Sequence, residues 1–170
     1  MVAIAAHADP APVVPAKDAP TTEPKEAQEA EHPKVSVGLL VGYASTSLNF
    51  GFGARGGYTF PMNLYVGGTL QYHLGTSVLD SRISLLYGGA EGGYDFHVGP
   101  VVIRPYGGIG PAFVLGGGET RAALGFWPGA TAYYGIPSTP VTVGADTRVL
   151  FNTAGGDPSF GFSVTGGVRF

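Results

Sequence analysis

The chain has 170 residues, no cysteine and a net charge of −3, and this length predicts one domain. The lack of cysteine excludes disulfides and thiolate metal sites, and the charge gives no indication of nucleic-acid binding. No apolar run reaches the roughly 18 residues that a membrane-spanning helix needs.

The N-terminal 33 residues differ in composition from the rest of the chain. Ala6-His7-Ala8 is a small-x-small cleavage pattern before Asp9, so we interpret residues 1–8 as the remnant of a secretory signal. The basic start of such a signal is missing, which leaves a plain alanine-rich N-terminus, or a true start before Met1, as alternatives. Residues 9–33 are rich in Pro, Ala and Glu and poor in large apolar side chains, so we expect a disordered tail.

Residues 34–170 predict an all-β domain. Apolar side chains alternate with small or polar ones, which is typical of strands with one buried face. Eight strands are expected, at 35–43, 50–60, 64–75, 82–98, 101–115, 122–136, 141–152 and 159–170. Pro105, Pro111 and Pro128 fall inside them, and because proline lacks an N–H we expect bulges or local breaks there.

Two kinds of connection alternate between these strands. Residues 61–63, 99–100 and 137–140 are tight and contain proline, whereas 44–49, 76–81, 116–121 and 153–158 are longer and richer in Ser, Thr, Gly or Asp. Short turns at one rim and longer loops at the other are typical of outer-membrane barrels. Both chain ends would then lie at the short-turn rim, on the periplasmic side.

The hairpin registers can be checked by arithmetic. Residues that face each other across an antiparallel hairpin have numbers with a constant sum and point to the same face. The sum is 199 for the hairpin at residues 99–100, 124 for that at 61–63 and 277 for that at 137–140. On the outer face these sums give facing pairs that are apolar over most of each hairpin, among them Phe96–Ile103, Phe52–Tyr72 and Phe126–Phe151.

The strands carry too few charges for a water-exposed barrel. Residues 35–170 hold six acids and six arginines, roughly 9% of the residues, against about 25% in an ordinary soluble domain. In a soluble lipocalin-like barrel the apolar face would point inward and a charged face would meet water. We therefore favour an apolar face toward lipid and a small polar face toward the lumen.

The last strand ends the chain on an aromatic residue. One face of it carries Phe160, Phe162, Val164, Val168 and Phe170, and this resembles the C-terminal signal that the outer-membrane assembly machinery reads. With its strand number and alternation, the domain 34–170 resembles the small eight-stranded outer-membrane barrels of the OmpA, OmpX and OmpW type. The resemblance implies outer-membrane lipids and the assembly machinery as partners, and we expect a monomer.

Aromatic residues also gather near both strand ends. Tyr58, Phe60, Tyr94, Phe96, Tyr134 and Phe170 lie toward the turn rim, and Tyr43, Phe50, Phe113, Phe126, Phe151 and Phe160 toward the loop rim. We interpret them as two interfacial girdles, although aromatic residues favour strands in any setting.

The inward faces hold two sets of candidate functional residues. The first is a network of charges that would plug the lumen: Arg55, Glu91, Asp95, Arg104, Asp146, Arg148 and Arg169; a gated polar pore is the alternative. The second lies toward the loop rim and would form either a packed core or an apolar ligand pocket: Leu40, Leu85, Tyr87, Val114, Trp127 and Leu150.

No catalytic or cofactor motif is recognisable. His73 and His97 lie on different strands, and neither belongs to the His-x-Ser pair of barrel lipid hydrolases. No Gly-rich segment is followed by the Lys and Ser or Thr of a phosphate loop. We therefore expect a non-catalytic envelope protein without metal or cofactor, and OmpW-like passage of small hydrophobic molecules is the main alternative.

Overall fold

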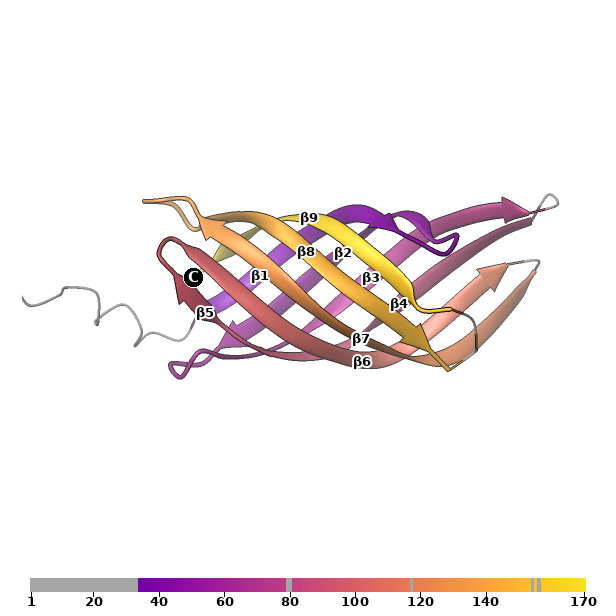
Figure 1. Ribbon diagram of the computed structural model, residues 1–170, viewed down its shortest axis with the longest axis horizontal. Helices are drawn as coiled ribbons and strands as arrows, with labels where there is room; N and C mark the ends of the chain where they lie inside the picture. Colours follow the sequence, from indigo (N-terminus) through magenta and orange to yellow (C-terminus); the bar gives the residue numbers. More distant parts are fainter. Residues whose placement is uncertain (1–33, 79–80, 117, 154, 156) are drawn as a thin grey trace, which may run out of the picture.

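The computed structural model describes residues 34–78, 81–116, 118–153, 155 and 157–170, which form strands joined by turns (Figure 1). The strands are β1 (Lys34–Ala44), β2 (Asn49–Thr59), β3 (Leu64–Val78), β4 (Ser81–Tyr94), β5 (Phe96–Val98), β6 (Val101–Gly116), β7 (Glu119–Gly135), β8 (Val141–Asn152) and β9 (Ser159–Arg169). No helix in this described part has the length and apolar character to cross a membrane. The predictions for residues 1–8 and 9–33 lie outside the described residues.

The strands form a single antiparallel sheet that closes on itself. Neighbours follow the order β4-β3-β2-β1-β9-β8-β7-β6-β5, and β4 also pairs with β6, which completes the ring. Both β4 and β5 lie beside β6, so together they make one strand of the wall. The prediction of an all-β, eight-stranded antiparallel barrel is confirmed.

The predicted hairpin registers are confirmed as well. Phe96 faces Ile103, Phe52 faces Tyr72 and Phe126 faces Phe151. The apolar members of these pairs are exposed on the outside of the sheet, with 41–52% exposed for Phe96, Ile103, Phe52, Phe126 and Phe151. The apolar face of every hairpin therefore points outward, and the small and charged face points into the lumen.

The strand expected at 82–98 is interrupted at Asp95, which corrects the prediction of one continuous strand. The backbone N–H of Asp95 donates to the carbonyl of Asn63 in the neighbouring turn, at 2.8 Å. Opposite the break lies Pro105, which stays paired with Ala130 of β7 and has no N–H to offer toward β4. The missing donor is a physical reason for the break.

The other two prolines break ladders in the same way. Pairs are missing at Pro111 between β4 and β6, and at Pro128 between β7 and β8. The register is unchanged across each gap, so the expectation of bulges or local breaks is confirmed in the form of breaks. Proline removes a donor without inserting a residue, and the register shift occurs instead between His73 and Thr76 in β3.

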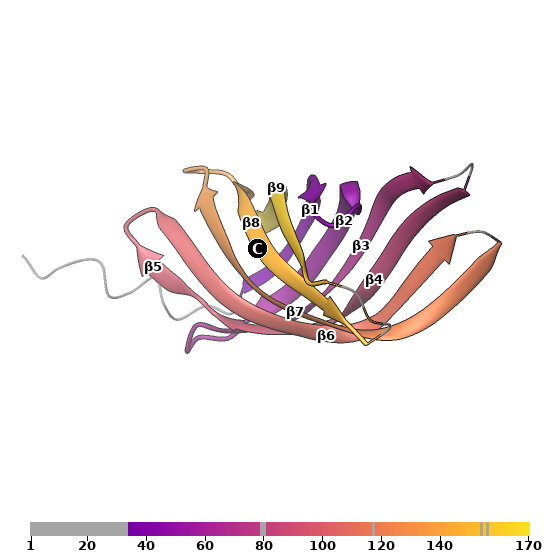
Figure 2. The same ribbon diagram turned by 45° about the vertical axis from the view of Figure 1, so that its right-hand side comes forward.

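The two rims of the barrel differ in how far their hairpins extend and in where the described chain begins and ends. Strands β1, β2, β8 and β9 have 11 or 12 residues, whereas β3, β4, β6 and β7 have 14 to 17, so the β3–β4 and β6–β7 hairpins extend further at the loop rim (Figure 2). At the turn rim the described chain begins and ends. There Val35 and Phe170 exchange backbone hydrogen bonds of 3.0 and 2.9 Å.

Adjacent glycines in β6 allow a test of how tightly the lumen is packed. Gly108 lies beneath Trp127 of β7, and a Cβ there would overlap the indole ring, whereas a Cβ at Gly107 would meet nothing within 4 Å. We expect Gly108→Ala to lower the free energy of unfolding by about 1–3 kcal/mol through overpacking. Gly107→Ala is the matched control, with a change within about 0.5 kcal/mol. Urea unfolding followed by Trp127 fluorescence measures both, and equal effects would contradict this description of the lumen.

Candidate functional site

The lumen is the candidate site, because every charged side chain of the predicted network points into it. Their side chains are 0–13% exposed. They come from β2, β4, β6, β8 and β9 and from the break between β4 and β5, so residues far apart in the sequence meet inside the barrel. The structure brings all seven together in two groups: Arg55, Glu91, Asp95, Arg104, Asp146, Arg148 and Arg169.

The first group, the rim cluster, surrounds Asp95 near the turn rim. Arg104 donates to Asp95 through Nε at 2.5 Å and through Nη2 at 3.0 Å. Arg169 donates to the same carboxylate at 3.2 Å. The Tyr133 hydroxyl donates to Asp95 at 2.9 Å, and Thr59 donates at 3.4 Å. One carboxylate therefore holds two guanidinium groups.

The second group, the central cluster, joins Arg55 and Arg148 to Glu91 and Asp146. Arg55 lies 2.8 Å from a carboxylate oxygen of each acid. Arg148 donates to Asp146 through two nitrogens, at 2.9 and 2.6 Å. Two arginines here face two carboxylates, so the central cluster is neutral in formal charge. Charge-assisted bonds of this kind are the strong ones in a dry interior.

Tyrosine rings lie against the guanidinium groups of the arginines. The Arg104 guanidinium lies 3.6 Å from the ring centre of Tyr65, and that of Arg55 lies 4.4 Å from Tyr106. The hydroxyl of Tyr106 donates to Asp146 at 2.9 Å. Sequence reasoning named these tyrosines neither as ring partners nor as donors in the network. The alternation of inward and outward positions could have found them, since Tyr65, Tyr106 and Tyr133 all fall on inward positions of their strands.

Toward the loop rim the lumen is filled by a packed apolar core. Leu85, Tyr87, Trp127 and Leu150 are each at most 4% exposed and form one cluster, with Val114 packed against it. Leu40 is also buried but lies outside that cluster. The indole N–H of Trp127 donates to Glu91 at 2.9 Å, which links this core to the central cluster.

One small cavity borders that core at Tyr87 and Leu150. This cavity, of about 10 Å³, lies among Ala44, Leu48, Tyr87 and Leu150. One water molecule needs roughly that much space. Of the six residues expected to form either a core or an apolar pocket, five are buried and Val114 is partly buried. All but Leu40 pack against one another.

The histidines do not form a reactive group. His73 is buried, its Nδ1 lies 3.3 Å from the carbonyl oxygen of Asn49, and its ring stacks on Tyr87 with centres 6.0 Å apart. His97 lies in β5 and is exposed. Within residues 34–170, apart from the undescribed positions, no three His, Asp or Glu side chains are grouped as a metal site would require.

The C-terminal segment forms β9 between β1 and β8. Phe160, Phe162 and Val164 are 48–61% exposed on the outer face, as is Phe170 at 70%. Val168 lies on the same face and is half-buried, paired with Val37 of β1 and Val141 of β8. The predicted aromatic face is therefore available along the seam where the last strand meets the first.

Comparison with known proteins identifies the fold. No protein-family model and no curated protein sequence matches this chain. Among solved structures, a major outer membrane protein from Thermus thermophilus matches with a TM-score of 0.63 and 15% identity, covering 82% of this chain and 100% of that one. The N-terminal β-barrel of Pseudomonas aeruginosa OprF matches with a TM-score of 0.60 and 12% identity, over 81% and 97% of the two chains.

A third structure, Neisserial surface protein A, has a TM-score of 0.57 and 20% identity, over 81% of this chain and 95% of its own. At these identities the likeness concerns the fold alone. The expected resemblance to small eight-stranded outer-membrane barrels is confirmed at that level.

The rim cluster predicts strong coupling between Asp95 and Arg104. Arg104→Ala leaves a buried carboxylate with one guanidinium partner fewer, and we expect it to lower the free energy of unfolding by about 3–5 kcal/mol. The double variant with Asp95→Ala should cost less than the sum of the single changes. Arg121→Ala removes an arginine that is 77% exposed, and should change stability by less than about 1 kcal/mol. Strictly additive effects of the two lumen substitutions would disprove the coupling.

Proposed function

We propose that this protein is an integral outer-membrane β-barrel with a structural or general envelope role, a plugged lumen and no catalytic activity. The observation that carries the proposal is that the barrel has its apolar face outside and its charged face inside, the reverse of a soluble barrel. Along the described strands most outward positions between the two rims hold apolar or aromatic residues, Gly, Ala or Pro, and Thr147 is a polar exception. Its hydroxyl donates to the carbonyl of Ala130 on the neighbouring strand, at 3.5 Å.

A lipid environment explains that outer face better than water does. Outward residues such as Val37, Leu39, Leu70 and Val164 are 54–66% exposed, and their cross-strand neighbours are all Gly, Ala or Val. A continuous apolar surface of this kind is expected to bind a membrane or a partner. Closure removes every sheet edge, which is the condition that a spanning sheet must meet in lipid.

Aromatic residues at the two rims support the same proposal. Tyr58 and Phe60 pack edge to face at 4.8 Å, and Tyr94 and Phe96 pack at 4.9 Å, all exposed near the turn rim. Phe126 and Phe151 pair near the loop rim at 6.1 Å. Such girdles mark the two interfaces of membrane barrels. In this arrangement the turn rim, with Phe170, faces the periplasm.

The plug is inferred from the two charge clusters and the packed core above them. Eight strands enclose a lumen that side chains can fill, and the arginines, carboxylates and tyrosines lie across it. The soluble lipocalin-like alternative requires an apolar interior and a charged exterior, which is the reverse of the observed distribution. Passage of small hydrophobic molecules requires space in the lumen beside the apolar core, and the cavity at Tyr87 and Leu150 measures about 10 Å³.

Deletion of Phe170 tests the proposed location. The aromatic C-terminus is the feature that the assembly machinery would read, so we expect the shortened chain to insert slowly and to accumulate outside the membrane fraction. Replacing Phe170 with Tyr keeps an aromatic end and should preserve insertion. Membrane fractionation after a short expression pulse measures both. Recovery of the unaltered protein as a soluble monomer without detergent would refute the membrane role.

The plug predicts a barrel that conducts poorly. In planar bilayers we expect conductance near zero or small and irregular, because the side chains of the two clusters lie across the lumen. Trp127 fluorescence should stay unchanged when small apolar compounds are added, because the indole is already buried. Large steady currents would contradict the plug, and a saturable fluorescence response would favour the hydrophobic-carrier alternative.

A further inference from the structure

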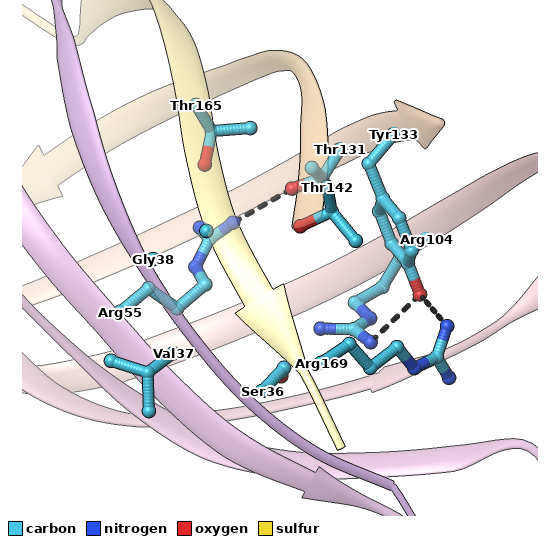
Figure 3. A pocket seen from close by; sticks show the side chains of 11 residues that line it. Ser36, Val37, Gly38, Arg55, Arg104, Thr131, Tyr133, Thr142, Thr165 and Arg169 are labelled. Carbon is cyan, nitrogen blue, oxygen red and sulfur yellow. Dashed lines mark hydrogen bonds between the residues drawn. The ribbon is translucent and has the colours of Figure 1, made fainter. Parts of the chain in front are cut away.

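A second cavity, of about 50 Å³, lies in the lumen toward the turn rim (Figure 3). It has room for several water-sized groups, so a small solute fits and a sugar or nucleotide does not. Residues from β1, β2, β6, β7, β8 and β9 line it: Ser36, Val37, Gly38, Arg55, Arg104, Thr131, Tyr133, Thr142, Thr165, Gly167 and Arg169.

The lining of this cavity is cationic. Three guanidinium groups reach it, those of Arg55, Arg104 and Arg169, together with hydroxyl groups of serine and threonine. None of the carboxylates of the two clusters is among the lining residues. A cavity with this wall offers an anion charged donors and offers a cation nothing comparable.

The rim cluster also carries a surplus of positive charge. Arg104 and Arg169 share the single carboxylate of Asp95, whereas the two arginines of the central cluster face two carboxylates. Across the seven buried charges, four are positive and three are negative. A buried charge without a partner is unfavourable, so an anion beside Arg104 and Arg169 would balance the lumen.

Several donors that line the cavity form no side-chain hydrogen bond with the residues that the structure describes. The Nε atom of Arg169 is buried and forms no hydrogen bond with the described residues. Around the same space, Ser36, Thr142 and Thr165 form no side-chain hydrogen bonds within residues 34–170, as far as these are described. The Oγ1 atom of Thr165 lies 3.6 Å from the position that a Cβ on Gly38 would occupy. Hydroxyls and a free N–H around one cavity are the groups that coordinate an oxyanion.

We propose that this cavity binds a small oxyanion of the size of inorganic phosphate or sulfate. Arg104 and Arg169 supply the charge, and the hydroxyls of Ser36, Thr142 and Thr165 complete the coordination. The wall of the barrel separates the cavity from lipid, so the anion is a free solute. The Arg169 side chain lines the cavity near the turn rim and is 13% exposed, so the anion enters from that rim.

The experiment uses the full chain refolded in a detergent without phosphate or sulfate groups. Inorganic phosphate or sulfate replaces gluconate, which is too large for the cavity, at constant ionic strength. The readouts are the thermal unfolding midpoint, followed by Trp127 fluorescence, and the heat of binding by titration calorimetry. We expect a saturable rise of the midpoint, and a saturable heat, with either oxyanion. The same rise in gluconate, or no saturable response, would overturn the proposal.

Variants separate the cavity from general salt effects. Arg169→Gln removes the surplus charge and should weaken the apparent affinity about tenfold or more. The double change Thr142→Val and Thr165→Val keeps every charge and should weaken it about two- to tenfold. Arg121→Gln removes an exposed arginine at the loop rim and should leave the affinity unchanged. Each response is measured relative to that variant's own midpoint in gluconate, so a loss of stability does not mimic a loss of binding.

An unchanged affinity in both lumen variants would refute the site. The outcome is independent of the proposed envelope role, because insertion and conductance are measured separately and do not depend on an anion. A barrel that inserts, blocks current and ignores phosphate and sulfate would refute the anion site alone.

Discussion

A sheet of eight strands that closes on itself leaves an interior just wide enough for side chains. This constraint decides the rest of the structure, because the inward face of this chain is the polar one. Charges that point inward cannot reach bulk water, so each must find a partner in the lumen. The rim cluster around Asp95 and the central cluster around Asp146 are the outcome.

The narrow lumen also explains the pairing of tyrosines with glycines. Tyr106 faces Gly93 and Tyr133 faces Gly144 across neighbouring strands, so each large ring covers a position without a side chain. The rings fill space as apolar groups would, and their hydroxyls satisfy the carboxylates of the clusters. The arginines then lie against ring faces, where a cation is favoured.

Packing and charge are distributed unevenly along the barrel axis. Near the loop rim, Trp127 and Leu150 belong to one packed apolar cluster, and the cavity beside Leu150 measures about 10 Å³. Near the turn rim, two arginines share one carboxylate, and a cavity of about 50 Å³ stays open beside them. The apolar end and the cationic end differ in what they could bind, although one barrel wall surrounds both.

The sequence by itself determined the strands of the barrel, their inward and outward faces and their hairpin registers. Alternation placed each residue on one of two faces, and turn positions fixed the hairpin registers, so the Asp95–Arg104 pair followed from numbers alone. Only the tertiary structure decided what meets across the lumen. Arg55 reaches Asp146 from 91 positions away, Trp127 donates to Glu91, and Leu40 stays apart from the apolar core. These contacts depend on the tilt and stagger of the closed sheet. Hairpin register relates only neighbouring strands, so it does not predict which side chains meet across the lumen.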